Sequence, residues 1–275
     1  MEKQKPVDHD FRQSFRNEFK RLFQKKLRLN RKKNKGFPQK QKTDMREKDF
    51  RIIGFDADDT LWVNEPYFQD TEKQFCELLA EFHPQGKTSE ELFKTEMQNL
   101  DLYGYGAKGF MLSMIETALR ISDNHVSQAT ISKIINLGKD LLQKPVVLLD
   151  DVQQVLECLH AKGIKLVVAT KGDLLDQERK LRKSNIEQYF HHVEVMSDKK
   201  ESDYLKLLSR LEIEPENFLM IGNSLKSDII PVLNIGGFGI HVPYHTIWQH
   251  EKTEQPNHRD NFMEIAHISE VLKIF

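Results

Sequence analysis

The sequence lacks the features that mark membrane and secreted proteins. It contains no run of 18 apolar residues, so we expect no transmembrane helix. Its N-terminal stretch has no apolar core of the signal-peptide kind, and we expect a cytoplasmic protein. Only two cysteines occur, Cys76 and Cys158, and both fall in apolar helical patterns. Two cysteines suggest neither a disulfide framework nor a cysteine-based zinc site, so we expect reduced, buried thiols.

Charge is distributed unevenly along the chain, although the formal net charge is only −1. Residues 1–48 hold 17 Lys/Arg and 6 Asp/Glu, whereas residues 49–275 hold 24 and 36. The small total therefore combines a basic N-terminal part with an acidic remainder. The whole chain of 275 residues, 39% of them hydrophobic, is long enough to bury a core in one large or two smaller domains.

Residues 1–48 are interpreted as a basic N-terminal extension. Phenylalanine and leucine recur at helical spacing over residues 10–29 with Lys and Arg between them, which predicts a basic amphipathic helix. The stretch RKKNKGFPQKQK after it is too polar to fold alone and is typical of a linker. The helix could lie on an anionic membrane surface, bind nucleic acid, or fold back on the acidic remainder. It could also be a solvated extension without a specific partner, and the residues leave these alternatives open.

From Asp49 onward the chain alternates between predicted strands and helices. The first strand is RIIGF, residues 51–55. Strands are predicted at 164–170, 192–197, 217–223 and 237–243, and helices at 151–162, 173–184, 203–211 and 227–235. Continuous apolar strands separated by helices predict a parallel sheet covered on both faces. The expected fold class is therefore α/β, with a doubly wound, Rossmann-like sheet.

Residues 66–143 interrupt this alternation. They have helical apolar spacing, as in PYFQDTEKQFCELLAEF, and contain no convincing strand. An α-helical block inserted after the first strand would lie over one edge of the sheet. We therefore assign residues 49–65 and 144–275 to the sheet domain and residues 66–143 to an inserted helical cap.

Polar residues follow the predicted strands at the points where the strands end. In a doubly wound sheet, ligands bind outside the carboxyl ends of the strands, so these side chains should gather at one edge. The candidates, in chain order, are Asp56, Asp58, Thr170, Lys171, Lys199, Lys200, Asn223 and Asp228. Clustered carboxylates repel one another unless a cation holds them, and oxygen ligands suit Mg²⁺.

An acidic Mg²⁺ site with a lysine and a threonine nearby suits a phosphoryl group, whose charge the metal and the lysine would neutralise. Asp56 is then the candidate nucleophile. Asp58 is the candidate general acid and base. Asp59 is interpreted instead as a residue that caps a following helix.

These residues resemble the four motifs of the haloacid dehalogenase (HAD) superfamily. The motifs correspond to DADDT, to Thr170 at the end of an apolar strand, to a lysine near position 199, and to GNSLKSD. The resemblance covers residues 50–245, with all four motifs in order and each at a strand end. Further stretches, such as DDTLWVNEPYF and YGYGAKGFMLSMIETA, are similar to one subgroup of HAD hydrolases.

The resemblance implies a mechanism. Asp56 would attack phosphorus and form an aspartyl-phosphate, and Asp58 would protonate the leaving group and then activate water. Mg²⁺ would be held by the Asp56 carboxylate, the Asp58 main-chain carbonyl and Asp228. Thr170 and a lysine would steady the phosphoryl oxygens. The helical block 66–143 would be the family's cap, which closes over the site and selects the leaving group.

The lysine assignments follow from spacing and position. The distance in sequence to Tyr204 favours Lys199 over Lys200 as the lysine of the third motif. Lys171, next to Thr170, is a further candidate for contact with the substrate. Lys108, in the flexible aromatic loop YGYGAKGF, could reach a substrate anion, or the loop could simply pack against the sheet domain.

Two departures from the family pattern stand out. The fourth motif often opens with Gly-Asp, whereas this chain has Gly222-Asn223. The neutral amide cannot supply a second acidic oxygen, so the metal would rest on Asp56 and Asp228, with Asn223 or water completing its ligands. The third motif lacks the usual Lys-Pro pair, which makes its lysine harder to assign than the aspartates.

The expected function is Mg²⁺-dependent hydrolysis of a small phosphorylated metabolite. Asp58 favours phosphate esters over carbon–halogen bonds, because only an oxygen leaving group needs a proton. One alternative is a phosphotransferase or phosphomutase that uses the same aspartate. Another is an interaction protein tethered by its basic N-terminal arm. Nothing in the residues of the cap identifies the substrate.

Overall fold

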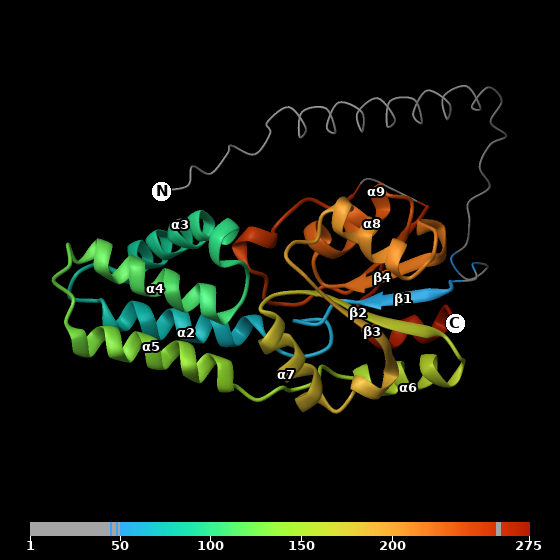
Figure 1. Ribbon diagram of the computed structural model, residues 1–275, viewed down its shortest axis with the longest axis horizontal. Coiled ribbons are helices and arrows are strands. Elements are labelled where there is room, and N and C mark those ends of the chain that lie inside the picture. The colour runs from blue at the N-terminus through green and yellow to red at the C-terminus, as the bar shows by residue number, and fades with distance from the viewer. Residues whose placement is uncertain (1–44, 46–47, 49, 257–259) are drawn as a thin grey trace, which may run out of the picture. The chain divides into compact units, whose positions relative to one another are not determined.

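The structure is a computed structural model, and it describes Met45, Lys48, and residues 50–256 and 260–275 (Figure 1). The chain divides into two units, with the boundary between Thr43 and Asp44. The fold described below is that of the second unit. The basic helix and linker predicted for the N-terminal extension lie outside the described residues, so their interpretation stays a prediction.

A parallel sheet forms the centre of this unit. Its strand order is β3-β2-β1-β4-β5-β6, and every neighbouring pair is parallel. The strands are β1 (Ile52–Phe55), β2 (Lys165–Lys171), β3 (Phe190–Met196), β4 (Phe218–Gly222), β5 (Phe238–His241) and β6 (Phe262–Glu264). Because β1 lies between β2 and β4, the chain reverses its direction of winding there. This confirms the predicted doubly wound, Rossmann-like α/β fold.

Helices cover both faces of the sheet (Figure 1). Their bounds are α6 (Val152–Ala161), α7 (Leu174–Ser184), α8 (Glu201–Arg210) and α9 (Ile230–Asn234), with short helical turns η2 (Glu187–Tyr189), η3 (Pro215–Asn217), η4 (Leu225–Ile229), η5 (Gln249–Glu251) and η6 (Ile268–Lys273). Alternate residues of β1 enter different cores, as the strand pleat requires. Ile53 and Phe55 pack with residues of α6 and η6, whereas Ile52 packs with residues of α8 and α9.

Five helices lie between β1 and β2, and the first four form a bundle, called here the α2–α5 bundle. They are α2 (Glu65–Leu78), α3 (Gln85–Tyr103), α4 (Ala107–Ile121) and α5 (Gln128–Gln143). The bundle has its own buried cluster, which includes Phe75, Leu92, Met114 and Ile134. Figure 1 shows it as a layer beside the sheet domain, reached from β1 and left toward α6. The helical content predicted for residues 66–143 is thus observed, with α2 starting one residue earlier.

The two chain segments that join the bundle to the sheet domain run side by side. The Val63 amide donates to the Val147 carbonyl at 2.9 Å, and the Leu149 amide donates to the Leu61 carbonyl at 3.0 Å. Trp62 lies between these bonds and is 1% exposed. We call residues 61–63 and 147–149 the connecting pair. Any movement of the bundle relative to the sheet therefore involves the backbone of this connecting pair.

Side-chain caps explain where several helices begin. Ser127 accepts from the Thr130 amide at the start of α5, and Asp173 accepts from the Asp176 amide at the start of α7. Each cap satisfies a backbone N–H that has no partner within its helix. The Asp173 cap also fixes the loop that follows β2, directly after two of the predicted site residues, Thr170 and Lys171.

The structure departs from the sequence prediction at two elements. The region predicted as one helix, residues 227–235, begins earlier as the wide π-helical turn η4 and continues as the short helix α9. The strand β6 was not predicted, because three residues, FME, give too short a pattern to recognise.

Within the described part of the chain, no helix is both long and apolar enough to cross a bilayer.

Two glycines should respond in opposite ways to alanine. A Cβ on Gly54 would lie 2.5 Å from Phe218 Cζ, inside the core, whereas a Cβ on Gly86 in α3 would meet nothing within 4 Å. We expect Gly54→Ala to lower the free energy of unfolding by about 1–3 kcal/mol through overpacking. Gly86→Ala should raise it by up to about 1 kcal/mol through helix propensity. Urea unfolding of both variants checks this, and equal effects would contradict the packing around Gly54.

Candidate active site

The carboxyl ends of β1, β2 and β4 meet at one edge of the sheet. The Asp56 amide donates to the Ile221 carbonyl at 2.9 Å, so the pairing of β1 with β4 continues up to the residue after the strand. Asp58 follows on the same loop. Thr170 is the penultimate residue of β2, and Asn223 follows β4 directly. All four residues line one cavity. The sequence predicted this gathering, and the parallel sheet produces it.

A buried lysine joins the first and fourth motifs. Lys199 Nζ lies 2.5 Å from Asp56 Oδ1 and 2.7 Å from Asp228 Oδ1. Lys199 is 2% exposed and Asp228 is 1% exposed, so this group is shielded from water. One ammonium between two carboxylates leaves a net negative charge at the end of β1. We call Asp56, Lys199 and Asp228 the buried triad.

The electrostatics of the buried triad are set by burial and by mutual attraction. Burial raises the pKa of Asp56, Asp228 raises it further, and Lys199 partly offsets both, so that the pKa of Asp56 is about 7. Burial alone would lower the pKa of Lys199, but Asp228 and Asp56 outweigh it and raise that pKa above its ordinary value. The lysine therefore stays charged, and Asp56 depends on a nearby cation to stay ionised.

The structure separates the two lysines that the sequence left in competition. Lys199 points into the buried triad, while Lys200 is exposed and pairs with Asp198 at 2.8 Å. Tyr204, whose spacing favoured Lys199, is fully buried, and its hydroxyl donates to the Ser227 carbonyl at 3.1 Å. Lys200 lies at the start of α8, pointing away from Asp56. Of the two, only Lys199 contacts the predicted nucleophile.

Asp58 is held by three donors that the sequence did not indicate. Its Oδ1 accepts from Trp62 Nε1 at 2.7 Å and from Lys180 Nζ at 2.9 Å, and its Oδ2 accepts from Gln177 Nε2 at 2.7 Å. Trp62 belongs to the connecting pair, and the other two donors lie on α7. Lys180 Nζ also donates to Asn64 Oδ1 at 2.8 Å, just before α2. The side chain of Asp58 thus depends on the connection to the bundle.

Asp59 caps α2 and does not share the hydrogen-bond donors of Asp58. Its carboxylate accepts from the amides of Asn64 and Glu65 at 2.9 to 3.1 Å. Burial raises the pKa of Asp59 to about 7 despite these bonds. This matches the capping role that the sequence indicated.

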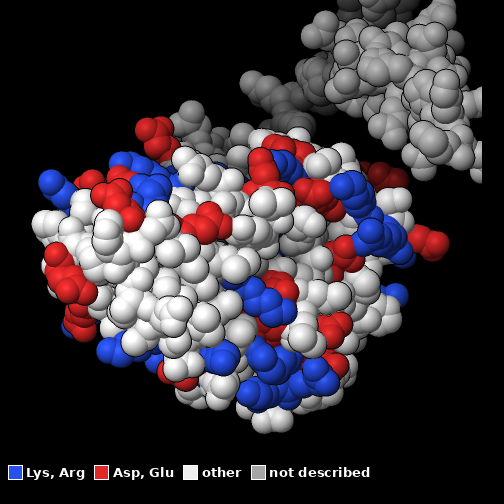
Figure 2. Space-filling view, turned by 60° about the vertical axis from the view of Figure 1, so that its left-hand side comes forward, with Lys and Arg blue, Asp and Glu red and all other residues white. Residues whose placement is uncertain are grey.

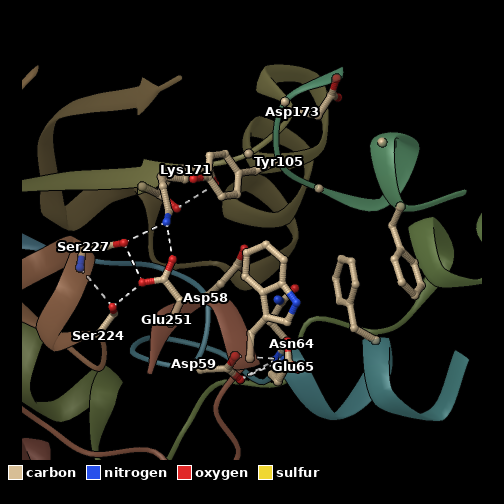
Figure 3. A pocket seen from close by; sticks show the side chains of 18 of the residues that line it. Asp58, Asp59, Asn64, Glu65, Tyr105, Lys171, Asp173, Ser224, Ser227 and Glu251 are labelled. Atoms are coloured by element: carbon tan, nitrogen blue, oxygen red, sulfur yellow. Dashed lines mark hydrogen bonds and ion pairs between the residues drawn. The ribbon is translucent and has the colours of Figure 1, made fainter. Parts of the chain in front are cut away.

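A second polar cluster, formed by Glu251, Lys171, Ser224 and Ser227, lines the same cavity (Figure 3). Glu251 in η5 accepts from Lys171 Nζ at 2.5 Å, from Ser224 Oγ at 2.5 Å and from Ser227 Oγ at 2.6 Å. Burial would raise the pKa of Glu251, but Lys171 and the two serines lower it to about 2. Lys171 Nζ also lies 4.3 Å from the ring centroid of Tyr105. The sequence analysis missed Glu251, because no motif marks a residue 80 positions from its partner.

Lys108 and Thr170 lie in different surroundings. Lys108 Nζ lies 2.9 Å from Asp173 Oδ1, is half exposed, and is not among the residues that line the cavity of Asp56. It lines a separate surface hollow instead. Thr170 is 2% exposed, and its hydroxyl donates to the Lys171 carbonyl at 3.2 Å. Contact of Lys108 with a substrate therefore stays a prediction.

The oxygen atoms beside Asp56 suit a hard cation. In the orientation that satisfies its neighbours, the Asn223 amide nitrogen lies 3.2 Å from both Asp56 Oδ2 and the Asp58 carbonyl, and 3.1 Å from Thr60 Oγ1. If a cation stood near these oxygens, the same amide could turn its own oxygen toward it. Such a set of ligands, completed by Asp228, suits Mg²⁺. It includes an amide and a main-chain carbonyl; among the described residues, no group of three or more His, Cys, Asp or Glu forms a metal site.

The cavity has a volume of about 190 Å³ and reaches from the sheet edge into the bundle. On the bundle side its wall includes three carboxylates and several aromatic rings. The residues are Glu65, Glu72, Glu96, Phe68, Tyr105 and Phe110. Burial raises the pKa of Glu65 to about 8, with Asp59 adding to the shift. Burial also raises the pKa of Glu96 to about 8, with Glu72 and Glu65 adding to the shift.

Comparison with known proteins agrees with this geometry. Residues 50–236 match the haloacid dehalogenase-like hydrolase family. The chain belongs to that family. The match runs from β1 through the bundle to α9 and contains every residue of the buried triad. It confirms the resemblance drawn from the four motifs, and it makes the chain a hydrolase of this family.

Individual relatives cover different shares of the chain. A haloacid dehalogenase-like family hydrolase from Xanthomonas campestris shares 35% identity and a TM-score of 0.73, over 83% of this chain and 93% of that one. A predicted phosphoglycolate phosphatase from Haemophilus somnus has the same fold, with 19% identity and a TM-score of 0.57, over 83% and 99%. An N-acylneuraminate-9-phosphatase from Mus musculus is 29% identical over 105 residues, 36% of this chain. That match spans only 42% of the relative's length.

The neighbouring lysines Lys199 and Lys200 form a matched pair for mutation. Lys199→Met would leave Asp56 and Asp228 buried without their cation, and we expect it to lower the free energy of unfolding by about 3–5 kcal/mol. Lys200→Met removes an exposed contact and should change it by no more than about 0.5 kcal/mol. Urea unfolding near neutral pH measures both. Similar losses for the two variants would show that the triad does not stabilise this HAD-family fold.

The raised pKa of Glu96 predicts a pH dependence. Because this pKa is about 8 in the folded protein and 4.5 is the ordinary value, the folded state keeps a proton that the unfolded chain releases. Stability therefore falls as the pH rises from about 4.5 to about 8. Glu96→Gln removes this pH-dependent contribution. Between about pH 5 and pH 8, the free energy of unfolding of the variant should therefore exceed that of wild type by about 1–3 kcal/mol. Parallel stability curves for the two proteins would contradict the assignment.

Proposed function

We propose that the chain is a Mg²⁺-dependent phosphatase that hydrolyses small phosphomonoesters through an aspartyl-phosphate on Asp56. The observation that carries the proposal is the buried triad at one end of a cavity that also holds Asp58. A carboxylate that touches a fixed ammonium is suited to approach an anionic phosphoryl group, because the ammonium offsets the added charge. Membership of the HAD-like hydrolases supports the same reaction class.

The proposed reaction has two displacements. In the first, a carboxylate oxygen of Asp56 bonds to phosphorus while the ester P–O bond breaks, and Asp58 gives its proton to the departing oxygen. In the second, Asp58 takes a proton from water, the water oxygen bonds to phosphorus, and the bond to Asp56 breaks. The products are an alcohol and inorganic phosphate, and both aspartates return to their starting states.

Other residues of the chain bind and orient. Lys199 neutralises charge beside Asp56, and the buried Thr170 hydroxyl could donate to a phosphoryl oxygen. Mg²⁺, when bound, would neutralise the phosphoryl charge, and Asp56, Asp228, the Asp58 carbonyl and Asn223 are the residues proposed to hold it. Lys171 lies beyond them, held by Glu251, at the rim where a substrate phosphate would enter.

The α2–α5 bundle is proposed to act as the cap of this enzyme. It supplies one wall of the cavity, and that wall excludes water from the reacting atoms. The bonds from Lys180 to both Asp58 and Asn64 link the acid–base residue to the start of α2. Movement of the bundle would therefore change the surroundings of Asp58, as opening and closing of a cap requires.

The proposal is tested by phosphate release from a panel of small phosphomonoesters, with Mg²⁺ and with a chelator. Wild type should release phosphate only with the metal. Asp56→Asn should lower kcat by at least about a thousandfold, because the amide is a poor nucleophile. Asp150→Asn is a matched control at an exposed aspartate outside the cavity and should stay near the wild-type rate.

Other outcomes would redirect the assignment. Release that persists in Asp56→Asn would contradict the covalent mechanism. Transfer of the phosphoryl group to a second hydroxyl without free phosphate would indicate a phosphotransferase or mutase. A folded wild type that releases phosphate from no ester would contradict the phosphatase, and the basic arm would then become the first place to look for a binding function.

A further inference from the structure

The charge of the cavity wall is strongly one-sided. Ten Asp or Glu residues line it, against three lysines. Each lysine already contacts a carboxylate: Lys171 contacts Glu251, Lys180 contacts Asp58, and Lys199 lies within the buried triad. No lysine among the described residues of the cavity wall is therefore left without a carboxylate partner to contact a leaving group.

Most of the carboxylates in the cavity wall also have an ion-pair or hydrogen-bond partner. Asp173 pairs with Lys108, Asp176 pairs with Arg179, and Asp59 caps α2. The remaining three, Glu65, Glu72 and Glu96, come from the bundle. Within the described part of the chain, no ion pair joins any of them to a lysine, an arginine or a histidine. They form an acidic wall without a counter-charge.

Only neutral donors contact this acidic wall. Glu65 accepts from Gln69 Nε2 at 3.3 Å, and Glu72 accepts from the Ser89 hydroxyl. The neutral Trp248 side chain partly offsets the rise in the pKa of Glu96. Neutral hydrogen bonds do not compensate the repulsion among desolvated carboxylates. This repulsion, together with burial, raises the pKa of Glu65 and of Glu96. A cation inside the cavity would relieve it.

A separate observation, nearer to Asp58, also indicates a donor on the ligand. Gln177 lines the same cavity and is 4% exposed. Its Nε2 donates to Asp58 and to the Lys171 carbonyl, whereas its Oε1 has no hydrogen-bond partner in the described structure. A buried acceptor without a donor costs free energy, and such groups are normally satisfied. A ligand that carries N–H or O–H groups could satisfy it.

Aromatic rings line the space between these acceptors. Phe68 and Phe110 pack with ring centroids 5.3 Å apart, and Tyr105 and Trp248 pack edge to face at 6.1 Å. Both pairs belong to the lining of the cavity. Aromatic faces attract ammonium groups more than they attract anions. On the face in Figure 2, Lys and Arg gather at the lower right, Asp and Glu are scattered, and much of the left half is uncharged.

We propose that the enzyme selects phosphomonoesters whose leaving group carries an ammonium, held by the acidic wall of Glu65, Glu72 and Glu96. The inference rests on the proposed phosphatase function and names the substrate class for the same site. The anionic phosphate would lie at the buried triad, and the cationic end would lie in the bundle. Esters whose leaving group carries a carboxylate would meet the acidic wall and be rejected.

Two sets of esters with different charge test the inference. One set is aminoethyl phosphate, hydroxyethyl phosphate and phosphoglycolate, which are cationic, neutral and anionic at the far end. The other is glucosamine 6-phosphate against glucose 6-phosphate, for a leaving group that fills more of the cavity. In at least one set, kcat/KM for the amine should exceed that of its neutral analogue by about tenfold, and phosphoglycolate should be the poorest substrate. Equal rates within both sets, or a preference for the anion, would overturn the inference.

Variants of the acidic wall assign the preference to its residues. The double variant Glu72→Gln, Glu96→Gln keeps the shape of both side chains and should reduce the amine preference by about tenfold, chiefly through KM. Glu77→Gln is the control, because Glu77 lies on α2 but is exposed and outside the cavity lining. A preference that survives the double variant would overturn the role of the wall.

Binding separates this inference from the phosphatase proposal. Calorimetric titration of the same esters into Asp56→Asn gives dissociation constants without turnover. If wild type hydrolyses no ester, the phosphatase proposal fails, and the order of these constants alone decides the charge preference. If wild type hydrolyses esters while the amine binds no more tightly than its neutral analogue, the phosphatase stands and the inference fails.

Discussion

The buried triad is the interaction on which the rest of the site depends. Asp56 is placed by β1, Lys199 by the start of α8, and Asp228 by η4, so three separate segments meet at one ammonium. Without the lysine, two carboxylates would face each other out of water, which costs several kcal/mol. The wide turn η4 serves this arrangement. Asp228 Oδ2 accepts from the Ser224 amide at 2.9 Å, which holds the carboxylate toward the lysine.

A second constraint links the bundle to the chemistry. The connecting pair carries Trp62, whose indole donates to Asp58, so the joint between two parts of the fold also positions the proposed acid–base residue. In a fold assembled only for stability, this joint could lie anywhere along the edge of the sheet. Because the joint lies beside Asp58, the environment of the Asp58 carboxylate depends on the position of the bundle. In the proposed mechanism, proton transfer by Asp58 and access of substrate would thereby be coupled through one tryptophan.

Sequence reasoning found what local patterns encode. Strand hydrophobicity and the polar residues that follow each strand were enough to predict the sheet and to gather Asp56, Asp58 and Asp228. It could not choose firmly between Lys199 and Lys200, because the choice depends on the angle at which α8 leaves its loop. Glu251 was missed for a related reason: its partners are distant in sequence, and burial beside a lysine leaves no mark on the local pattern.

The two ends of the cavity differ in how their charge is compensated, and the proposed selection of cationic esters rests on this difference. At the sheet edge, lysines contact Asp56, Asp58, Asp228 and Glu251, and backbone donors contact Asp59. In the bundle the acidic wall is matched by nothing but neutral donors. Half-buried carboxylates without a counter-charge add no stability to the fold. Burial raises the pKa of Glu65 and of Glu96, and these shifts lower the free energy of unfolding at neutral pH. The presence of these carboxylates in a cavity wall is therefore best explained by a ligand that supplies the missing positive charge.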